Sequence, residues 1–182
     1  MHLETERLIL RAFAPGDAEI FAAYRSDPEV ARYQSWEAPY SLEQARLFIA
    51  ALQGVAPGRP GEWYQVALEL RATGRLIGDC AFQISAAMPR QAEMGFSLAR
   101  AYQGQGYMTE AGRRLLASLF TEFGLHRVYA FCDTENLGSA RLLERLGLRR
   151  EGCFVDSLWF KGRWASEYAY AILRREWERR PG

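Results

Sequence analysis

The chain has 182 residues and a net charge of +1, and 49% of its residues are hydrophobic. This length favours one domain with a single core, and the balanced charge gives no field that would attract nucleic acid or anionic lipid. The longest hydrophobic run, residues 168–173, is too short to span a bilayer, and the first residues lack the apolar stretch of a signal peptide. We therefore expect a cytoplasmic enzyme or binding domain that contacts neither nucleic acid nor membrane.

The cysteines give no sign of a disulfide framework or a metal site. Cys80, Cys132 and Cys153 lie far apart in apolar stretches, and the chain has only two histidines. An odd, unclustered set supplies neither paired half-cystines nor the spacing of metal ligands. We expect all three to be small core residues, and we expect no metal.

The N-terminal third predicts one strand and two helices. Residues 8–13 have the composition of a strand, and residues 17–25 carry apolar side chains at helical spacing. Ser41 begins a capping box that opens a helix to residue 52. Residues 53–61 hold five Gly or Pro and predict a loop within the same domain.

The middle of the chain predicts three strands, followed by the helix with the clearest apolar periodicity in the chain. Residues 64–70, 76–84 and 92–98 are rich in apolar and aromatic letters, as in strands. Residues 109–123 repeat apolar side chains every four positions, and Gly124 follows as a stop signal.

The C-terminal part predicts a strand at 127–132, a capped helix at 136–146 and a hairpin with arms at 155–160 and 167–173. The whole order is one strand, two helices, three strands, helix, strand, helix and two strands. This order indicates a mixed α/β sheet in a single domain, residues 1–182, and not a regular alternation of strand and helix.

One segment joins a strand, a glycine-bearing loop and the start of a helix. Residues 103–109, QGQGYMT, lead directly into the predicted helix 109–123. The first N–H groups of a helix have no internal partner and carry positive potential, so this segment suits a phosphate group. It lacks the Lys of a Walker loop and the third Gly of a dinucleotide fingerprint. A turn that only caps the helix is the alternative.

Four pieces of the chain resemble the GNAT superfamily, the Gcn5-related N-acetyltransferases that use acetyl-CoA. Residues 103–108 are similar to its pyrophosphate loop, and residues 133–147, DTENLGSARLLERLG, to its second acyl-CoA motif. The opening, residues 4–11, and the tail, residues 162–177, resemble the ribosomal-protein (Rim-type) branch. The pieces occur in the family's order and cover essentially the whole chain.

The resemblance implies the GNAT fold, an α/β architecture. Its central, twisted, mostly antiparallel sheet has about seven strands, is flanked by about four helices and splays between strands four and five. It also implies direct transfer of an acetyl group from acetyl-CoA to an amine in a ternary complex. The cofactor contacts that it implies are Phe96 and Leu98 through their backbone, Gln103, Gly104, Gln105, Gly106, Tyr107, Met108 and Thr109 in the loop, and Asn136 and Ser139 beyond it.

Two positions depart from the family pattern. Met108 stands where the family usually has Gly or Ala. Leu143 stands where many members carry a Tyr that protonates the leaving thiolate, which leaves Ser139 as the nearest candidate acid. Satisfying an N–H group at the helix start is an equally good explanation of Ser139. Because a thiol has a pKa of about 8.5, the reaction tolerates a missing acid.

Glu93 is the expected general base, acting through water, because it lies on the strand that leads to the splay. Asp79 is a second choice, and each is also explained as an ordinary strand carboxylate. The leading acceptor is a protein N-terminal α-amine. A small amine, such as an amino sugar or an antibiotic, and a catalytically idle acyl-CoA-binding domain are the alternatives.

Trp36 lies in the region that forms the acceptor wall in this family, so we expect it to bind substrate. Trp159 and Trp164 could line the same cleft or pair across their hairpin. Arg113 and Arg114 are candidates for contact with the CoA phosphates. The expected partners are acetyl-CoA and an amine acceptor, and a homodimer is left open.

Overall fold

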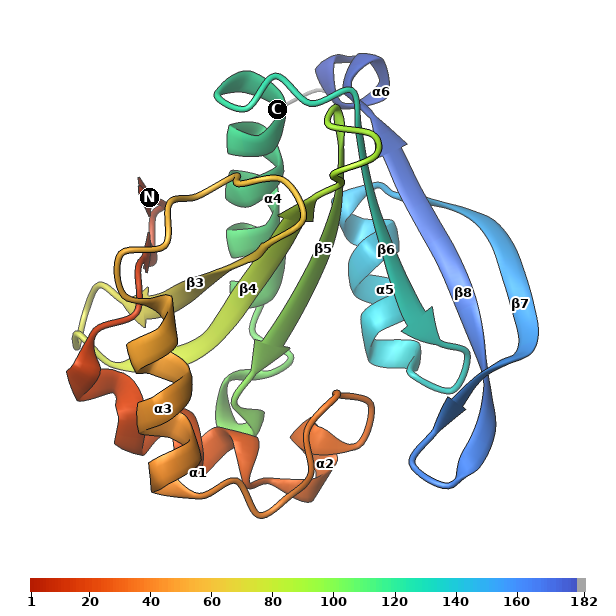
Figure 1. Ribbon diagram of the computed structural model, residues 1–182. Helices are drawn as coiled ribbons and strands as arrows, with labels where there is room; N and C mark the ends of the chain where they lie inside the picture. The colour runs from red at the N-terminus through yellow and green to blue at the C-terminus, as the bar shows by residue number, and fades with distance from the viewer. Residues whose placement is uncertain (180–182) are drawn as a thin grey trace.

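The computed structural model describes residues 1–179, so the last three residues of the predicted domain lie outside the described part. Eight strands form one sheet in the order β1-β2-β3-β4-β5-β6-β8-β7, with β5 and β6 as its one parallel pair (Figure 1). The strands are β1 (His2–Glu4), β2 (Leu8–Arg11), β3 (Trp63–Leu70), β4 (Leu76–Ile84), β5 (Gln91–Leu98), β6 (Arg127–Asp133), β7 (Arg149–Phe160) and β8 (Arg163–Leu173). The predicted mixed, mostly antiparallel sheet is confirmed. The additional strand is β1, whose three residues are too few to show a pattern.

Six α-helices accompany the sheet within residues 1–179. They are α1 (Ala18–Arg25), α2 (Pro28–Ala31), α3 (Leu42–Leu52), α4 (Tyr107–Thr121), α5 (Leu137–Leu146) and α6 (Arg174–Glu178), with 3-10 turns η1 (Pro15–Asp17) and η2 (Arg100–Tyr102). The sequence missed α2 and α6 because four or five residues cannot display a 3.6-residue period. No helix of this part of the chain has the length and apolar character needed to cross a membrane.

The helices cover both faces of the sheet. α4 and α5 pack on one face, where Phe82, Leu115 and Phe120 are fully buried, and α1 and α3 pack on the other around Phe21 and Ile49 (Figure 1). Because β4 lies between both layers, eight of its nine residues are buried. This explains why apolar and polar residues do not alternate along it, although Asp79 and Gln83 interrupt the apolar run.

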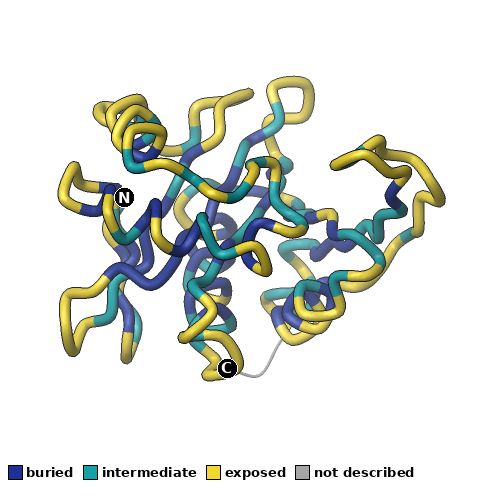
Figure 2. The backbone as a smooth tube through the Cα atoms, turned by 90° about the horizontal axis from the view of Figure 1, so that it is seen from below, coloured by how far each residue is buried: buried dark blue, intermediate teal, exposed yellow. Residues whose placement is uncertain are grey.

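β7 is the edge strand of the sheet, and it is exposed along almost its whole length. Figure 2 shows buried segments gathered at the centre of the molecule and exposed ones at its outer turns. Cys153 lies on β7 and is exposed, whereas Cys80 and Cys132 are buried. The prediction that all three cysteines belong to the core is therefore wrong for Cys153. Its apolar neighbours in sequence do not reveal that the strand has no partner on one side.

β5 separates from β6 after a short stretch of pairing. The parallel register runs only from Gln91 opposite Arg127 to Glu93 opposite Tyr129, whereas β5 stays paired with β4 as far as Leu98. The last residues of β5 thus have one paired edge and one open edge. This is the predicted splay, since β5 and β6 are the fourth and fifth of the strands expected from the sequence.

Gly78 sets how closely β4 approaches this part of β5. A Cβ at Gly78 would lie 2.3 Å from the carbonyl oxygen of Ser97, a backbone atom that cannot rotate away. We expect Gly78→Ala to lower the free energy of unfolding by about 1–3 kcal/mol, measured by urea denaturation. Gly95→Ala is the control on the neighbouring strand, because nothing lies within 4 Å of its added Cβ. Equal losses in the two variants would contradict the close approach at Gly78.

Candidate active site

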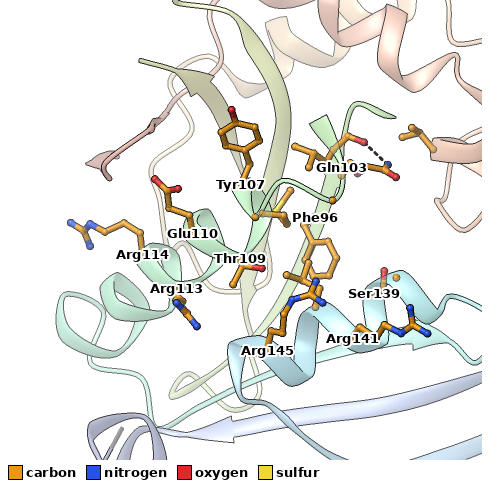
Figure 3. Close-up of a pocket in the computed structure, with 18 of the residues that line it drawn as sticks. Phe96, Gln103, Tyr107, Thr109, Glu110, Arg113, Arg114, Ser139, Arg141 and Arg145 are labelled. Carbon is orange, nitrogen blue, oxygen red and sulfur yellow. Dashed lines mark hydrogen bonds between the residues drawn. The ribbon is translucent and has the colours of Figure 1, made fainter. Parts of the chain in front are cut away.

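A cavity of about 1270 Å³ lies between the end of β5, the first half of α4 and α5 (Figure 3). It brings together ten of the predicted site residues: Phe96, Leu98, Gln103, Gly104, Gly106, Tyr107, Met108, Thr109, Asn136 and Ser139. Three others, Gln105, Glu93 and Trp36, do not line it. Segments that are distant in the sequence therefore converge on one site.

The loop before α4 depends on two glycines in the left-handed region. Gly104 has φ +75° and Gly106, the N-cap of α4, has φ +82°, a conformation that side chains strongly disfavour. As a glycine, Gly106 offers no side chain to cap the first turn. The N–H groups at the start of this 15-residue helix are thus left for a ligand. The helix begins and ends two residues earlier than predicted, so the loop is shorter than expected.

Two glutamine side chains bond the loop to the end of β5 and to η2. The Gln103 side chain donates to the carbonyl of Leu98 at 2.9 Å, and the Gln105 side chain donates to the carbonyl of Ala101 at 2.8 Å. Gln105 thus turns back onto η2, which explains why it does not line the cavity. Both contacts hold the loop in place beside the splay.

The register of β5 decides which backbone groups face the splay. Ser85 N–H donates to the Gln91 carbonyl at 2.9 Å and Ala99 N–H to the Ile77 carbonyl at 2.8 Å, so the odd-numbered residues of β5 bond to β4. In an antiparallel pair the alternate residues point the other way. Phe96 and Leu98 therefore turn their N–H and C=O groups toward the splay. N–H groups in this position can polarise a carbonyl group.

The side chain of Gln34 also lies at the open edge of β5, and the sequence analysis did not identify it. Its side chain donates to the Phe96 carbonyl at 3.3 Å and lines the cavity together with Tyr33. Trp36, which the sequence analysis expected to bind substrate, packs against the hydrophobic cluster of the α1–α3 layer. Its ring centroid lies 3.8 Å from the Arg25 guanidinium, and its Nε1 donates to the Arg25 carbonyl at 3.0 Å. An irregular loop gives no periodic signal that separates a core residue from a lining residue.

Ser139 lies on the first turn of α5 and lines the cavity. Its backbone N–H is capped by the Asn136 side chain at 3.1 Å, while its hydroxyl has no hydrogen-bond partner within residues 1–179. Leu143, one turn further on, is fully buried. Ser139 is therefore free to act on a ligand, and Leu143 is a packing residue.

Glu93 lies where the β5–β6 pairing ends, on the opposite face of the sheet from the cavity. Side chains alternate along a strand, and its neighbour Met94 is buried against the α4–α5 layer. Burial, and then the negative charge of Glu167 on β8, raises the pKa of Glu93. Burial, followed by the charge of Asp133, also raises the pKa of Glu167. The cavity and this carboxylate thus approach the splay from opposite faces of the sheet.

Asp79, the second choice for a base, lies inside the α1–α3 layer. It accepts a hydrogen bond of 2.6 Å from the Tyr24 hydroxyl and lies 3.8 Å from Arg25. Burial raises the pKa of Asp79, but the residue does not line the cavity. These contacts give it a structural role.

Four arginines of α4 and α5 line the cavity. Arg113 and Arg114 come from α4, and Arg141 and Arg145, which the sequence analysis missed, come from α5 (Figure 3). Arg114 also lies 3.8 Å from Glu122. The spacing of four residues between Arg141 and Arg145 places them on one side of α5 and could have identified them. This concentration of positive charge suits a ligand with several phosphates.

The two hairpin tryptophans lie outside this cavity. Trp159 and Trp164 contact each other across β7 and β8, with ring centroids 5.4 Å apart in an edge-to-face arrangement. Both are exposed. Cross-strand pairing, the second of the two interpretations, accounts for their positions.

Comparisons with known proteins agree with the family resemblance found in the sequence. Residues 7–149 match the family model described as an acetyltransferase (GNAT) domain. The chain is 34% identical over 177 residues to "Uncharacterized N-acetyltransferase YnaD" of Bacillus subtilis, which covers 97% of this chain and 99% of that protein. A crystal structure of a GNAT-family acetyltransferase from Bacillus anthracis superposes with a TM-score of 0.87 at 32% identity, over 97% of this chain and 100% of the other.

Some similar proteins carry names that refer to ribosomal proteins. "Putative ribosomal N-acetyltransferase YdaF" of Bacillus subtilis is 29% identical in an alignment of 185 positions that covers 95% of this chain and 94% of that protein. RimL, described as a ribosomal L7/L12 alpha-N-protein acetyltransferase and solved with coenzyme A, has a TM-score of 0.81 at 19% identity over 95% of this chain and 98% of the other. The RimL structure shares the fold.

The burial of Leu143 makes a prediction about stability. We expect Leu143→Ala to lower the free energy of unfolding by about 2–5 kcal/mol, because it opens a cavity between α5 and the sheet. Leu137→Ala, at an exposed position of the same helix, should change it by less than about 0.5 kcal/mol. Chemical denaturation measures both. A Leu143→Ala protein with unchanged stability but no turnover would show a chemical role for this position.

Proposed function

Since the chain belongs to the GNAT family of N-acetyltransferases, we propose that it transfers an acetyl group from acetyl-CoA to a protein N-terminal α-amine within a ternary complex. The observation that carries the proposal is the meeting of the glycine loop and the open edge of β5 in one cavity. The loop provides anion-binding N–H groups, and the edge provides N–H groups beside which a thioester can lie.

The donor site fits the chemical parts of acetyl-CoA, which supplies the activated acetyl group as a thioester. Residues 104–109 would hold the diphosphate with their main-chain N–H groups. The α4 and α5 arginines add positive charge to the lining of the cavity. Phe96 and Leu98 would contact the pantetheine and acyl groups through their backbone, and Asn136 and Ser139 line the wall opposite.

The acceptor amine attacks the thioester carbon from the other face of the sheet. A new C–N bond forms, the C–S bond breaks, and the amine loses one proton. Glu93 would accept that proton through a water molecule, and the Ser139 hydroxyl is the candidate donor to the leaving thiolate. An unassisted thiolate also leaves readily, because the pKa of a thiol is about 8.5.

An α-amine is the acceptor that needs the least help from a general base. Its pKa is about 7.7–8.0, so roughly a tenth of it is neutral at pH 7, against under one part in a thousand for a lysine side chain. The similarity to YdaF also favours a ribosomal-protein N-terminus.

A screen of thiol release from acetyl-CoA tests the proposal. The panel holds peptides with free N-termini, the same peptides with blocked N-termini, and small amines. We expect release only with free N-termini, with the acetyl group found on the α-nitrogen by mass spectrometry. Turnover only of small amines would make the enzyme a small-molecule acetyltransferase. CoA binding without any turnover would indicate an idle acyl-CoA-binding domain.

The donor loop makes a separate prediction. Gly106→Glu should weaken CoA binding, measured by calorimetry, by at least about tenfold, because it adds a side chain and a negative charge at the N-terminus of α4. Gly162→Glu is the matched control, since Gly162 has a similar φ of +81° in the β7–β8 turn. If both variants bind CoA as the wild type does, the diphosphate lies elsewhere.

The role of Glu93 is tested by kinetics. Glu93→Gln should lower kcat at neutral pH by about 10²–10⁴-fold while the affinity for CoA stays unchanged. The loss should shrink as the pH approaches the pKa of the acceptor amine, because free amine then forms without help. A loss below about threefold would leave Glu93 as an ordinary strand carboxylate.

The charge of Glu167 predicts the direction in which the pH profile of the enzyme shifts when this residue is replaced. Because that charge contributes to the raised pKa of Glu93, Glu167→Gln should lower this pKa. The base then stays ionised in more acidic solution, so the acid limb of the kcat/KM profile should move to lower pH. Glu178→Gln, an exposed carboxylate on α6, is the control and should leave the limb in place. A shift to higher pH would contradict the assignment.

A further inference from the structure

The turn between β1 and β2 docks on the loop before α4 through one arginine. The Arg7 backbone N–H donates to Glu110 Oε1 at 2.9 Å, and its Nε donates to Glu110 Oε2 at 2.6 Å. Its Nη1 donates to the Gln105 carbonyl at 3.1 Å, and the guanidinium carbon lies 4.3 Å from the centre of the Tyr107 ring. A residue near the N-terminus thus contacts both sides of Gly106.

Glu110 is an unexpected neighbour for an anion-binding loop. It lies in the first turn of α4 and lines the same cavity as the loop. A carboxylate there stabilises the helix start but repels a diphosphate. Burial alone would raise its pKa, yet hydrogen bonds from Thr5 and Arg7 lower the pKa of Glu110, so the group is negatively charged at neutral pH. Binding of an anionic ligand therefore requires that this charge be compensated.

We infer that Arg7 is a positioning residue for donor binding. Its guanidinium neutralises Glu110 and holds the Gln105 carbonyl, so that the N–H groups of residues 104–109 remain available to the diphosphate. This inference rests on the proposed donor site. It assigns a role to Arg7 within residues 4–11, a segment that the sequence analysis had noted only for its resemblance to the family.

The contacts favour this indirect role over direct contact with a phosphate. Nε and Nη1 of Arg7 are engaged by Glu110 and Gln105, and the guanidinium lies against Tyr107. Nη2 lies 3.4 Å from the position that a Cβ on Gly106 would take. Nη2 is thus in ordinary contact distance of that position, and the need for glycine at Gly106 comes from its φ of +82°.

A double-mutant cycle separates the two roles. Calorimetry with CoA and with dephospho-CoA is done on Arg7→Met, Glu110→Gln and the double variant. We expect Arg7→Met to weaken both ligands by about tenfold, as for one uncompensated charge near a diphosphate. Glu110→Gln should change affinity by less than about threefold. The double variant should bind about as well as Glu110→Gln, because the charge that needs neutralising is gone.

Arg71→Met is the matched control. Arg71 lies in the turn between β3 and β4 and contacts the β1–β2 turn. Its Nη1 donates to Glu4 and to the Thr5 carbonyl at 3.0 Å, and its side chain is 45% exposed against 41% for Arg7. It does not line the cavity. We expect it to leave CoA affinity unchanged, and we expect Arg7→Lys to recover part of the loss by restoring the charge. In turnover assays Arg7→Met should raise the KM for acetyl-CoA and leave kcat unchanged.

Several results would overturn the inference. A double variant as weak as Arg7→Met would mean that Arg7 touches the phosphate directly. A loss for CoA but not for dephospho-CoA would place Arg7 at the 3′-phosphate. Equal losses in Arg7→Met and Arg71→Met, with lowered melting temperatures, would mean that the turn matters only for folding. If the wild type binds no CoA, the donor site and the inference fail together, whereas CoA binding without amine turnover removes only the proposed activity.

Discussion

The separation of β5 from β6 after Glu93 is the constraint on which the arrangement of the site depends. β5 remains bonded to β4 through Leu98, so the strand is held rigidly on one edge while its other edge is open. Backbone groups that lose their partner need another one, from water or from a ligand. The register, not the side-chain identity, decides that Phe96 and Leu98 present these groups. This explains how the acyl site that we propose can be formed by two apolar residues.

The splay also divides the site between two faces of the sheet. The cavity with its glycine loop and arginines lies on the α4–α5 face, and Glu93 lies on the face covered elsewhere by α1 and α3. Reactants that approach from opposite faces meet only at the open edge. The arginines of α4 and α5 suit the phosphates of the donor that we propose, and Glu93, near Glu167, suits an amine on the other face.

The parts of the structure that the sequence predicts are those whose signal is local. The order of the strands, the helices α3, α4 and α5, and the glycine loop follow from periodicity, capping residues and left-handed glycines within a few positions of each other. Two of the residues that the sequence analysis did not single out, Gln34 and Arg7, depend on distant contacts. Gln34 meets Phe96 from 62 residues away, and Arg7 meets Glu110 from 103 residues away. No pattern within one segment contains such information.

The segment that carries Gln34 and Trp36 shows the same dependence on distant contacts. Lys161, in the turn between β7 and β8, donates to the carbonyls of Ala31 at 2.9 Å and Trp36 at 2.6 Å. Together with the stacking of Trp36 on Arg25, this contact fixes the loop that carries Gln34 to the edge of β5. A rigid loop of this kind can hold a polar side chain at the splay without regular secondary structure. The sequence analysis singled out Trp36 in this segment because it is an aromatic residue. In the structure, tertiary contacts pack Trp36 against Arg25, and Gln34 is the side chain that contacts the open edge of β5.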